Sequence, residues 1–221
     1  MRCFLSASLL LLLLLLSCNR QAYRDLEKIQ PAQPLSSAAL KPRLDKALYR
    51  CVVDGKFVFK KFHLSGILYL KHLGAEGDRV VFQSEMGNTF FDFGWNNKDS
   101  FRVYNIIDQM NKPALIKTLR KDFELLLVKG LGGQPEGVYQ SAKDRATYTR
   151  FNLAKGFTYY ITNSSSMLTG IDNADEKRKV VTMRFTPPSP LQQLPETINI
   201  RHLRAHFTID LKKITPDDTP E

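Results

Sequence analysis

The side chains that could bind a metal ion are few and are badly spaced for that purpose. His202 and His206 are four residues apart, which is the spacing of two metal ligands on one face of a helix. Their segment, however, alternates apolar and polar residues with a period of two, which is typical of a strand. Four residues of strand span about 13 Å, so the two imidazoles cannot share one ion. We therefore expect both histidines to face solvent and the chain to bind no metal.

Two pairs of acidic residues could suggest a glycoside hydrolase, because Asp92 lies near Asp99 and Asp122 lies near Glu124. A glycosidase needs two carboxyl groups at a defined separation across the substrate, and nothing in the sequence places these pairs in that way. The sequence also has no Gly-x-Ser-x-Gly elbow, no phosphate-binding loop and no His-Glu-x-x-His. We therefore expect solvated carboxylates in a protein that is not an enzyme and needs no cofactor. An enzyme acting on lipid or glycan is a minor alternative.

Cys18 is the residue that could carry a covalent lipid. It follows a charged amino terminus, a leucine run from Leu9 to Leu16 and the small residue Ser17. This order is typical of a secretory signal, and the run is too short to span a bilayer comfortably. Leu15-Leu16-Ser17-Cys18 also resembles a bacterial lipobox, in which the chain is cut before the cysteine and lipid is attached to its sulfur and amine. We expect residues 1–17 to be a lipoprotein signal peptide and Cys18 to anchor the chain in a membrane.

Two other interpretations of this segment stay open. One is an ordinary secretory signal followed by an incidental cysteine, and the other is a signal anchor, which the short apolar core disfavours. If Cys3 leaves with the signal and Cys18 takes lipid, Cys51 remains and cannot form an internal disulfide. Cys51 lies in a strand-like run, so we expect a buried structural thiol.

The composition is that of an ordinary globular protein, with 43% hydrophobic and 24% charged residues. The formal net charge of +10 would suit nucleic acid, anionic lipid or acidic proteins. For an exported chain nucleic acid is the least suitable of these. The densest basic cluster is only Lys177-Arg178-Lys179, so we expect a solvated basic face and no nucleic-acid partner.

The chain divides into a tether and one domain. Residues 18–44 are polar and contain three prolines, which indicates a lipid-anchored flexible tether. Roughly 25 residues of this kind reach on the order of 80 Å when extended. Residues 45–215 form a single β-rich domain, and residues 216–221 form a polar tail.

About ten short strands are expected in this domain, because apolar and polar residues alternate between turn signals. The alternation is sharpest over Thr89–Trp95. Asp54-Gly55 is expected to be a hairpin turn, and Gly66 is expected to interrupt a strand. The proline-rich segment 187–190 should end another strand.

One helix is well marked over residues 113–128. Asn111 can cap it, Pro113 suits its first turn, and Gly130 suits its end. The apolar residues that recur at helical spacing are Leu115, Leu119, Phe123 and Leu126. They predict a helix that packs on the core, although a membrane-surface helix is an alternative. A second helix is expected near residues 36–47.

These elements predict a mainly β (α+β) fold, in which a large curved antiparallel sheet carries one or two helices on one face. So few helices leave concave apolar surface that must either close or hold a cavity, and such a cavity is a natural site for an acyl chain. The candidate cavity-lining residues are the large apolar side chains of the central strands and the helix, namely Phe82, Phe91, Phe93, Trp95, Leu115, Leu119 and Phe123.

At this point the pattern resembles the lipoprotein carrier and receptor superfamily (LolA/LolB-like), and lipoproteins of similar size occur in the Bacteroidetes. The segments that carry the resemblance are Arg79–Phe93, Pro113–Val128 and Leu194–Leu211. The resemblance implies an open half-barrel with a hydrophobic cavity capped by helices, which holds the acyl chains of lipoproteins in transit. Leu73 could be the counterpart of the exposed loop leucine of the receptor members, although a loop-edge strand residue explains it equally well.

The resemblance also implies a location. Asn19 follows Cys18 at the position where some bacteria use Asp to retain a lipoprotein in the inner membrane, and residues 19–21 have no acidic stretch for export to the cell surface. Both points imply the periplasmic face of the outer membrane. We expect a non-catalytic lipoprotein that binds an acyl chain, a lipid or a lipoprotein, with a role in lipoprotein localisation or outer-membrane maintenance. A scaffold lipoprotein of an envelope complex, with a packed core and an exposed patch at the sheet rim, is the alternative.

Overall fold

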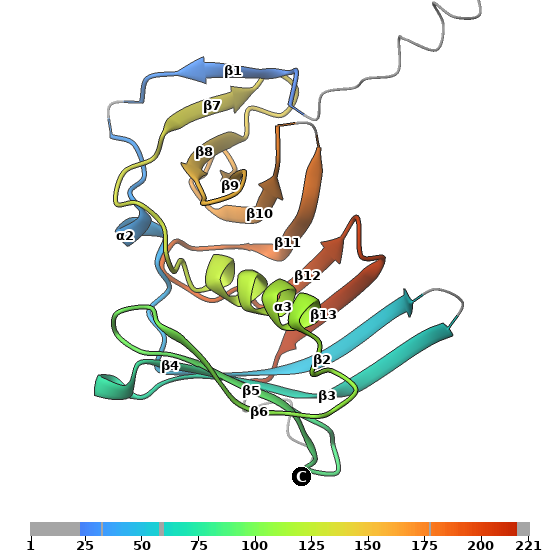
Figure 1. Cartoon of the computed structure of the whole chain (residues 1–221). Helices are drawn as coiled ribbons and strands as arrows, with labels where there is room; N and C mark the ends of the chain where they lie inside the picture. The colour runs from blue at the N-terminus through green and yellow to red at the C-terminus, as the bar shows by residue number, and fades with distance from the viewer. Residues whose placement is uncertain (1–22, 32, 58–59, 177, 216–221) are drawn as a thin grey trace, which may run out of the picture.

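The computed structural model describes residues 23–31, 33–57, 60–176 and 178–215 (Figure 1). Within these ranges thirteen strands form one antiparallel sheet with the order β1-β7-β8-β9-β10-β11-β12-β13-β2-β3-β4-β5-β6. The strands are β1 (Leu26–Ile29), β2 (Lys46–Phe57), β3 (Lys60–His72), β4 (Asp78–Gln83), β5 (Thr89–Trp95), β6 (Phe101–Ile106), β7 (Gly137–Ser141), β8 (Thr147–Asn152), β9 (Phe157–Thr162), β10 (Leu168–Ala174), β11 (Lys179–Ser189), β12 (Thr197–His202) and β13 (Phe207–Lys213).

The sheet curves strongly but stays open, because β1 and β6 lie at its two ends and each pairs with one neighbour only. Figure 1 shows strands β7 to β11 curled at one end and strands β2 to β6 spread out at the other, with helix α3 lying across the hollow between them. The predicted curved antiparallel sheet with a helix on its concave face is therefore confirmed.

Helix α3 (Pro113–Leu126) is the element that covers the concave face. Pro113 occupies its first turn, where the missing N–H costs no helical hydrogen bond. The residue at the N-cap is Lys112, which makes no side-chain cap, so the prediction that Asn111 caps the helix is wrong. After the helix, Val128 and Gly130 both have positive φ, and Gly130 tolerates that conformation without strain.

Two shorter helical segments lie elsewhere in the described part of the chain. Helix α2 (Ser37–Leu40) is a single turn, and the Ser36 hydroxyl caps it by accepting a hydrogen bond from the Ala39 amide at 3.3 Å. Its last residue, Leu40, packs into the main core. The 3-10 helix η2 (Gly74–Glu76) joins β3 to β4. The second helix predicted near residues 36–47 is thus present in a shorter form.

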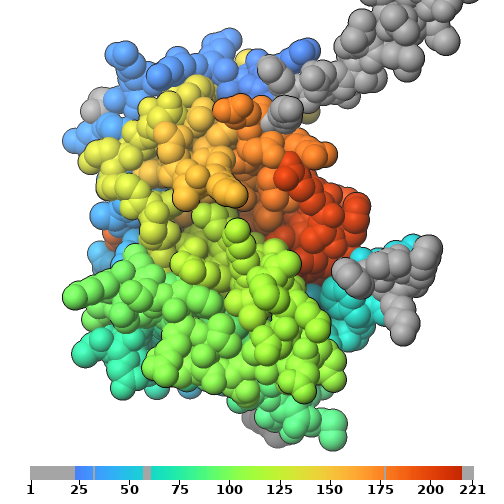
Figure 2. Space-filling model, in the orientation of Figure 1, coloured from blue at the N-terminus to red at the C-terminus, as the bar shows by residue number. Residues whose placement is uncertain are grey.

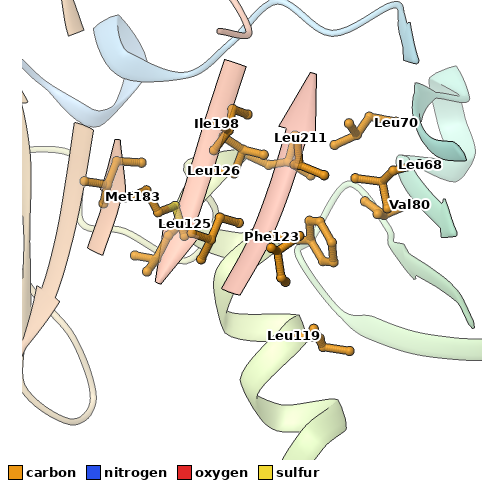
Figure 3. Packing of buried hydrophobic residues seen from close by; sticks show 14 of the residues in the cluster. Leu68, Leu70, Val80, Leu119, Phe123, Leu125, Leu126, Met183, Ile198 and Leu211 are labelled. Atoms are coloured by element: carbon orange, nitrogen blue, oxygen red, sulfur yellow. The ribbon is translucent and has the colours of Figure 1, made fainter. Parts of the chain in front are cut away.

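The main core lies between α3 and the sheet. Figure 3 shows Phe123 of α3 facing Leu68, Val80 and Leu211, which come from three different strands. All four side chains are essentially excluded from solvent. A second, smaller cluster lies in the curl at the other end of the sheet and consists of Ala146, Phe157, Tyr159, Ile161 and Ala174 with Tyr23, Leu26, Tyr139 and Tyr148 packed against them.

Two glycines lie inside strands at points where neighbouring groups come close to the backbone, which the sequence did not indicate. Gly55 lies inside β2 opposite Phe62 of β3, so the hairpin turn predicted at Asp54-Gly55 is wrong. A Cβ on Gly55 would come within 2.3 Å of the Phe62 ring. Gly66 continues β3 where a break was predicted, and a Cβ there would lie 1.9 Å from the carbonyl oxygen of Gln83. Both positions need glycine because neighbouring groups approach closely.

Strand β11 also runs further than the prolines suggested, since it extends through Pro187 and Pro188 to Ser189. The pairing with β10 changes register there, from Gly170 opposite Arg184 to Leu168 opposite Ser189. The prolines fall inside this irregularity, where a missing N–H costs no regular ladder bond.

The predicted tether is shorter than expected. Residues 26–29 form β1, which pairs with β7 in a register that places Leu26 opposite Ser141 and Ile29 opposite Val138. With Leu40 buried as well, much of the segment 26–44 belongs to the folded domain. The prolines of this segment, Pro31, Pro34 and Pro42, lie outside β1 and so do not interrupt its pairing. The predicted signal peptide, the lipidated Cys18 and the polar tail lie outside the described residues.

Candidate functional site

The interface between α3 and the concave face of the sheet is the candidate site. Burial increases along the helix: its first two residues are exposed, Leu115 and Ile116 are half-buried, and Leu119, Phe123 and Leu126 are buried. The amino-terminal half of α3 therefore has the weaker hold on the sheet, and the carboxyl-terminal half is embedded in it. Figure 2 shows α3, in light green, as part of the molecular surface between the two ends of the sheet.

The structure brings the predicted cavity-lining residues together at this interface. Phe82, Phe91, Phe93 and Trp95 are at most 3% exposed. The Phe91 ring stacks on Phe93 with centroids 4.5 Å apart and lies 5.8 Å from Phe123 of the helix. Leu115 packs at the edge of the same cluster, half-buried. These side chains fill the space between them with one another, so the interface is closed in this state.

A polar pair lies in the middle of this apolar interface. Asp122 of α3 and His202 of β12 approach to 2.9 Å between Oδ2 and Nε2, and their side chains are 0% and 3% exposed. The imidazole also stacks on Phe207 with centroids 3.9 Å apart. The expectations that His202 faces solvent and that Asp122 is a solvated charge are both wrong.

The error over His202 has a structural reason. The prediction treated residues 197–211 as one alternating run, whereas the structure has two strands with a turn between them. In β12 the inward residues are Ile198, Ile200 and His202, and in β13 they are Phe207, Ile209 and Leu211. The inward residues therefore have even numbers in β12 and odd numbers in β13. A single alternating run based on the odd positions placed His202 on the outer face, whereas it points inward.

The electrostatic state of the pair follows from its burial. Removal from water raises the pKa of the Asp122 carboxyl, and the hydrogen-bonding and charge contributions of His202 oppose that rise without cancelling it. The contact is short, yet both carboxyl oxygens of Asp122 and Nε2 of His202 are buried without a hydrogen bond of good geometry, so the pair satisfies its polar atoms incompletely. An imperfectly paired carboxyl under a helix is a weak point in an otherwise apolar contact.

Further polar contacts hold the carboxyl-terminal end of α3. The Tyr160 hydroxyl donates to the Leu125 carbonyl at 2.7 Å, and the Trp95 indole N–H donates to the Glu124 carboxylate at 3.3 Å. Just beyond the helix, Lys129 Nζ lies 2.7 Å from an oxygen of Asp78. These contacts hold the end of the helix to strands from both ends of the sheet.

Lys129 joins two acidic side chains, because its Nζ also lies 3.0 Å from an oxygen of Asp99. Burial alone would lower the pKa of Lys129, but hydrogen bonds to Asp78 and Asp99 raise it overall. Burial alone would raise the pKa of Asp78, but hydrogen bonds from Lys129 and His72 lower it overall. Asp92, the other acidic residue of the first pair, accepts two hydrogen bonds from Arg79 at 2.6 and 2.7 Å.

Cys51 is buried and free, as expected, and burial raises the pKa of its thiol to about 12. Among the described residues, no three side chains of the metal-ligating types gather into one group. In the same part of the chain, no helix has the length and the apolar character needed to cross a bilayer.

Comparison with known proteins finds similarity at the level of solved structures. A LolA superfamily protein from Nitrosomonas europaea has a TM-score of 0.46 and 9% identity, over 81% of this chain and 88% of the other. An outer membrane lipoprotein-sorting protein domain from Vibrio parahaemolyticus has a TM-score of 0.47 and 6% identity, over 84% and 91% of the two chains. A DUF1329 family protein from Desulfovibrio piger has a TM-score of 0.46 and 9% identity, over 78% and 85%.

No protein-family model and no curated protein sequence matches this chain.

Proposed function

We propose that this chain is a non-catalytic, membrane-anchored lipoprotein that binds an acyl chain, a lipid or a lipoprotein between α3 and the concave face of the sheet. The observation that carries the proposal is that the two halves of α3 differ in burial and in polar contacts with the sheet. Its 14 residues cover an aromatic surface, yet only the carboxyl-terminal half is deeply buried and tied by polar contacts. The lipobox at Cys18 and the residues after it support the periplasmic face of the outer membrane as the location.

Binding would require the amino-terminal half of α3 to move away from the sheet, because side chains fill the interface. An acyl chain would then take the place of Leu115 and Leu119 in the apolar cluster that contains Phe91 and Phe93. Each methylene moved from water into such a site contributes about 0.8 kcal/mol. The contacts of Glu124, Leu125 and Lys129 would keep the carboxyl-terminal half in place as the fixed end.

The absence of catalysis in this proposal is supported by the surroundings of the acidic residues. Asp92, Asp99 and Glu124 each form an ion pair with a basic side chain of this chain, and Asp122 contacts an imidazole. Each of these four carboxyl groups is thus engaged by a side chain of the same protein.

The single tryptophan of the chain provides the test. Trp95 is 1% exposed, lies 5.2 Å from Phe101 and contacts Glu124 of α3. A fatty acid with a bromine or nitroxide on its chain should quench Trp95 fluorescence saturably if it enters the interface. Leu119→Glu should abolish this saturable quenching, because it places a charge in the proposed path. Lys117→Glu, on the exposed side of the same helix, should leave it unchanged.

Native mass spectrometry of the protein after gentle extraction is the independent measurement, and it should find a bound lipid. Quenching no stronger than that of free tryptophan, together with a ligand-free mass, would overturn the proposal. That result would favour the scaffold lipoprotein, which the closed and packed interior already supports as the second candidate. Crosslinking in the envelope would then be expected to recover a stable partner protein.

A further inference from the structure

The first described residue, Tyr23, is held firmly in the curl formed by strands β7 to β11. We call this part, with β1, the β7–β11 lobe; it comprises residues 26–29 and 137–189. The Tyr23 ring lies 4.8 Å from that of Tyr159 and 6.2 Å from that of Phe157, centroid to centroid. Its hydroxyl donates to Asp172 at 3.2 Å. Burial, followed by the charge of Asp172, raises the pKa of this hydroxyl, so it keeps its proton.

The partner of that hydroxyl is itself a buried and charged group. Asp172 is 0% exposed, and its two oxygens lie 2.8 Å from Lys179 Nζ and 2.6 Å from a guanidinium nitrogen of Arg184. Lys179 also lies over the Tyr23 ring, 4.8 Å from its centroid. Tyr23 is therefore fixed by an aromatic contact, a hydrogen bond and a cation, which come from three strands.

The residues after Tyr23 are fixed to the same lobe. The Ala142 amide donates to the Asp25 carbonyl at 3.2 Å, and β1 then pairs with β7 along its whole length. The described fold is thus held from its first residue, Tyr23, and only residues 19–22 separate Tyr23 from Cys18 along the sequence.

We infer that the β7–β11 lobe is the face that the protein presents to the phospholipid headgroups of its membrane. The inference rests on the proposed lipidation of Cys18. Four residues between the two positions allow at most about 18 Å between the Cα atoms of Cys18 and Tyr23. Part of that length lies within the headgroup layer, which is about 5–8 Å thick. The lobe must then stay close to the bilayer, and the rest of the domain extends away from it.

The charge of the lobe suits an anionic surface at this distance. Two cations surround the single carboxylate of Asp172, and Lys179 and Arg184 keep 29% and 45% of their side chains exposed. Other exposed basic residues of the lobe are Lys28, Lys143, Arg145, Lys155 and Arg178. Glu27, Asp144 and Glu176 are exposed there too, so the short connection, and not charge alone, sets the orientation. Attraction acts over the Debye length of about 8 Å.

This orientation keeps other surfaces away from the anchoring bilayer. Strands β4 to β6 and η2 lie at the end of the sheet opposite β1 (Figure 1). Leu73, which precedes η2, would face away from the membrane that holds Cys18. A role for Leu73 at that same bilayer is therefore inconsistent with the inference.

Energy transfer from single dyes to headgroup-labelled lipid tests the orientation. The lipidated full chain is reconstituted on preformed vesicles of phosphatidylethanolamine and phosphatidylglycerol. A dye is placed on Lys143→Cys in the lobe or on Met86→Cys in the exposed β4–β5 turn. Cys51 stays unlabelled because its thiol is buried and weakly acidic. Transfer should be several-fold more efficient from position 143, and equal or reversed efficiencies would overturn the inference.

A longer connection is the matched control. Insertion of about 20 Gly and Ser residues between Ala22 and Tyr23 frees the domain from the short connection, so transfer from position 143 should fall to the level of position 86. Tyr23→Ala should lower it too, whereas Tyr104→Ala, in an exposed tyrosine of β6, should not. Circular dichroism checks that both variants are folded. Unchanged transfer after the insertion would show that the connection does not orient the domain.

The outcomes separate this inference from the proposed function. If lipidated wild-type protein does not bind vesicles, the anchor and the orientation fail together. If it binds with the lobe inward but Trp95 shows no saturable quenching, the orientation stands and acyl-chain binding fails.

Discussion

Asp122 of helix α3 and His202 of strand β12 form a fully buried polar contact of 2.9 Å at the centre of an apolar interface. Removing one partner leaves the other buried without compensation. His202→Leu or Asp122→Leu alone should therefore lower the free energy of unfolding by about 3–5 kcal/mol. The double replacement with leucine should recover most of that loss or exceed wild-type stability, because well-packed apolar residues can replace a buried pair.

Urea denaturation of the four proteins in this double-mutant cycle measures the coupling. If the changes in unfolding free energy of the two single variants add up to that of the double variant, the contact has no energetic role. The double variant also tests acyl-chain binding: because the imperfectly paired carboxyl is a weak point under α3, two leucines should hold the helix more firmly on the sheet, and this variant should bind a fatty acid more weakly than wild type.

The same pair predicts a pH dependence. Burial raises the pKa of Asp122 in the folded protein above its unfolded value of about 3.9. A carboxyl with a raised folded-state pKa stabilises the fold below the unfolded pKa, and this contribution is lost as the pH rises through the folded-state pKa. The unfolding free energy of wild type, relative to that of Asp122→Asn, should therefore fall as the pH rises above about 4. A difference that is constant or grows with pH would contradict the raised pKa.

The ion pair of Lys129 and Asp78 should give the unfolding free energy the opposite pH dependence. Lys129→Met leaves Asp78 and Asp99 without the ammonium group, and the loss of a buried partner costs about 3 kcal/mol. Because the pKa of Asp78 is lowered in the folded protein, its contribution is present above about pH 4 and is lost as the pH falls. The destabilisation by Lys129→Met should thus shrink in acid. Lys117→Met, at an exposed position of α3, should change stability by less than about 0.5 kcal/mol.

Gly66 should not tolerate a methyl group. A Cβ would stand 1.9 Å from a backbone oxygen of the next strand, and backbone cannot move away as a flexible side chain can. Gly66→Ala should lower the unfolding free energy by about 2 kcal/mol or more, as overpacking does. Gly133→Ala is the control, because nothing lies within 4 Å of its added Cβ; thermal denaturation should find it neutral or slightly stabilising.

The sequence was a good guide wherever a residue's role depends on its immediate neighbours. The alternation over Thr89–Trp95 and the apolar face of residues 113–126 identified a strand and a helix with nearly correct ends. The residues that cover the concave face were found for the same reason, since periodicity alone assigns a side chain to a face.

Features that depend on distant segments could not be read in this way. Gly55 and Gly66 look like turn and break signals, and only the approach of Phe62 and Gln83 shows why glycine is required. Asp122 seemed solvated because its partner is 80 positions away along the chain. The docking of Tyr23 depends on Asp172 and Tyr159, so the apparent tether could not be recognised as part of the fold.

Cys18→Ala tests the anchor itself. The described strands and both core clusters are built from residues 23–215, so the substitution should leave the thermal midpoint of the folded domain unchanged. Membrane retention should be lost, because stable anchoring needs more than one acyl chain and the lipidated cysteine would supply them. Fractionation of cells that express wild type, Cys18→Ala and the control Cys51→Ala measures this. Cys51→Ala should stay in the membrane fraction despite a less stable core, since it removes a buried thiol. A Cys18→Ala protein that still fractionates with membranes would refute the lipobox interpretation, and with it the short connection that orients the β7–β11 lobe.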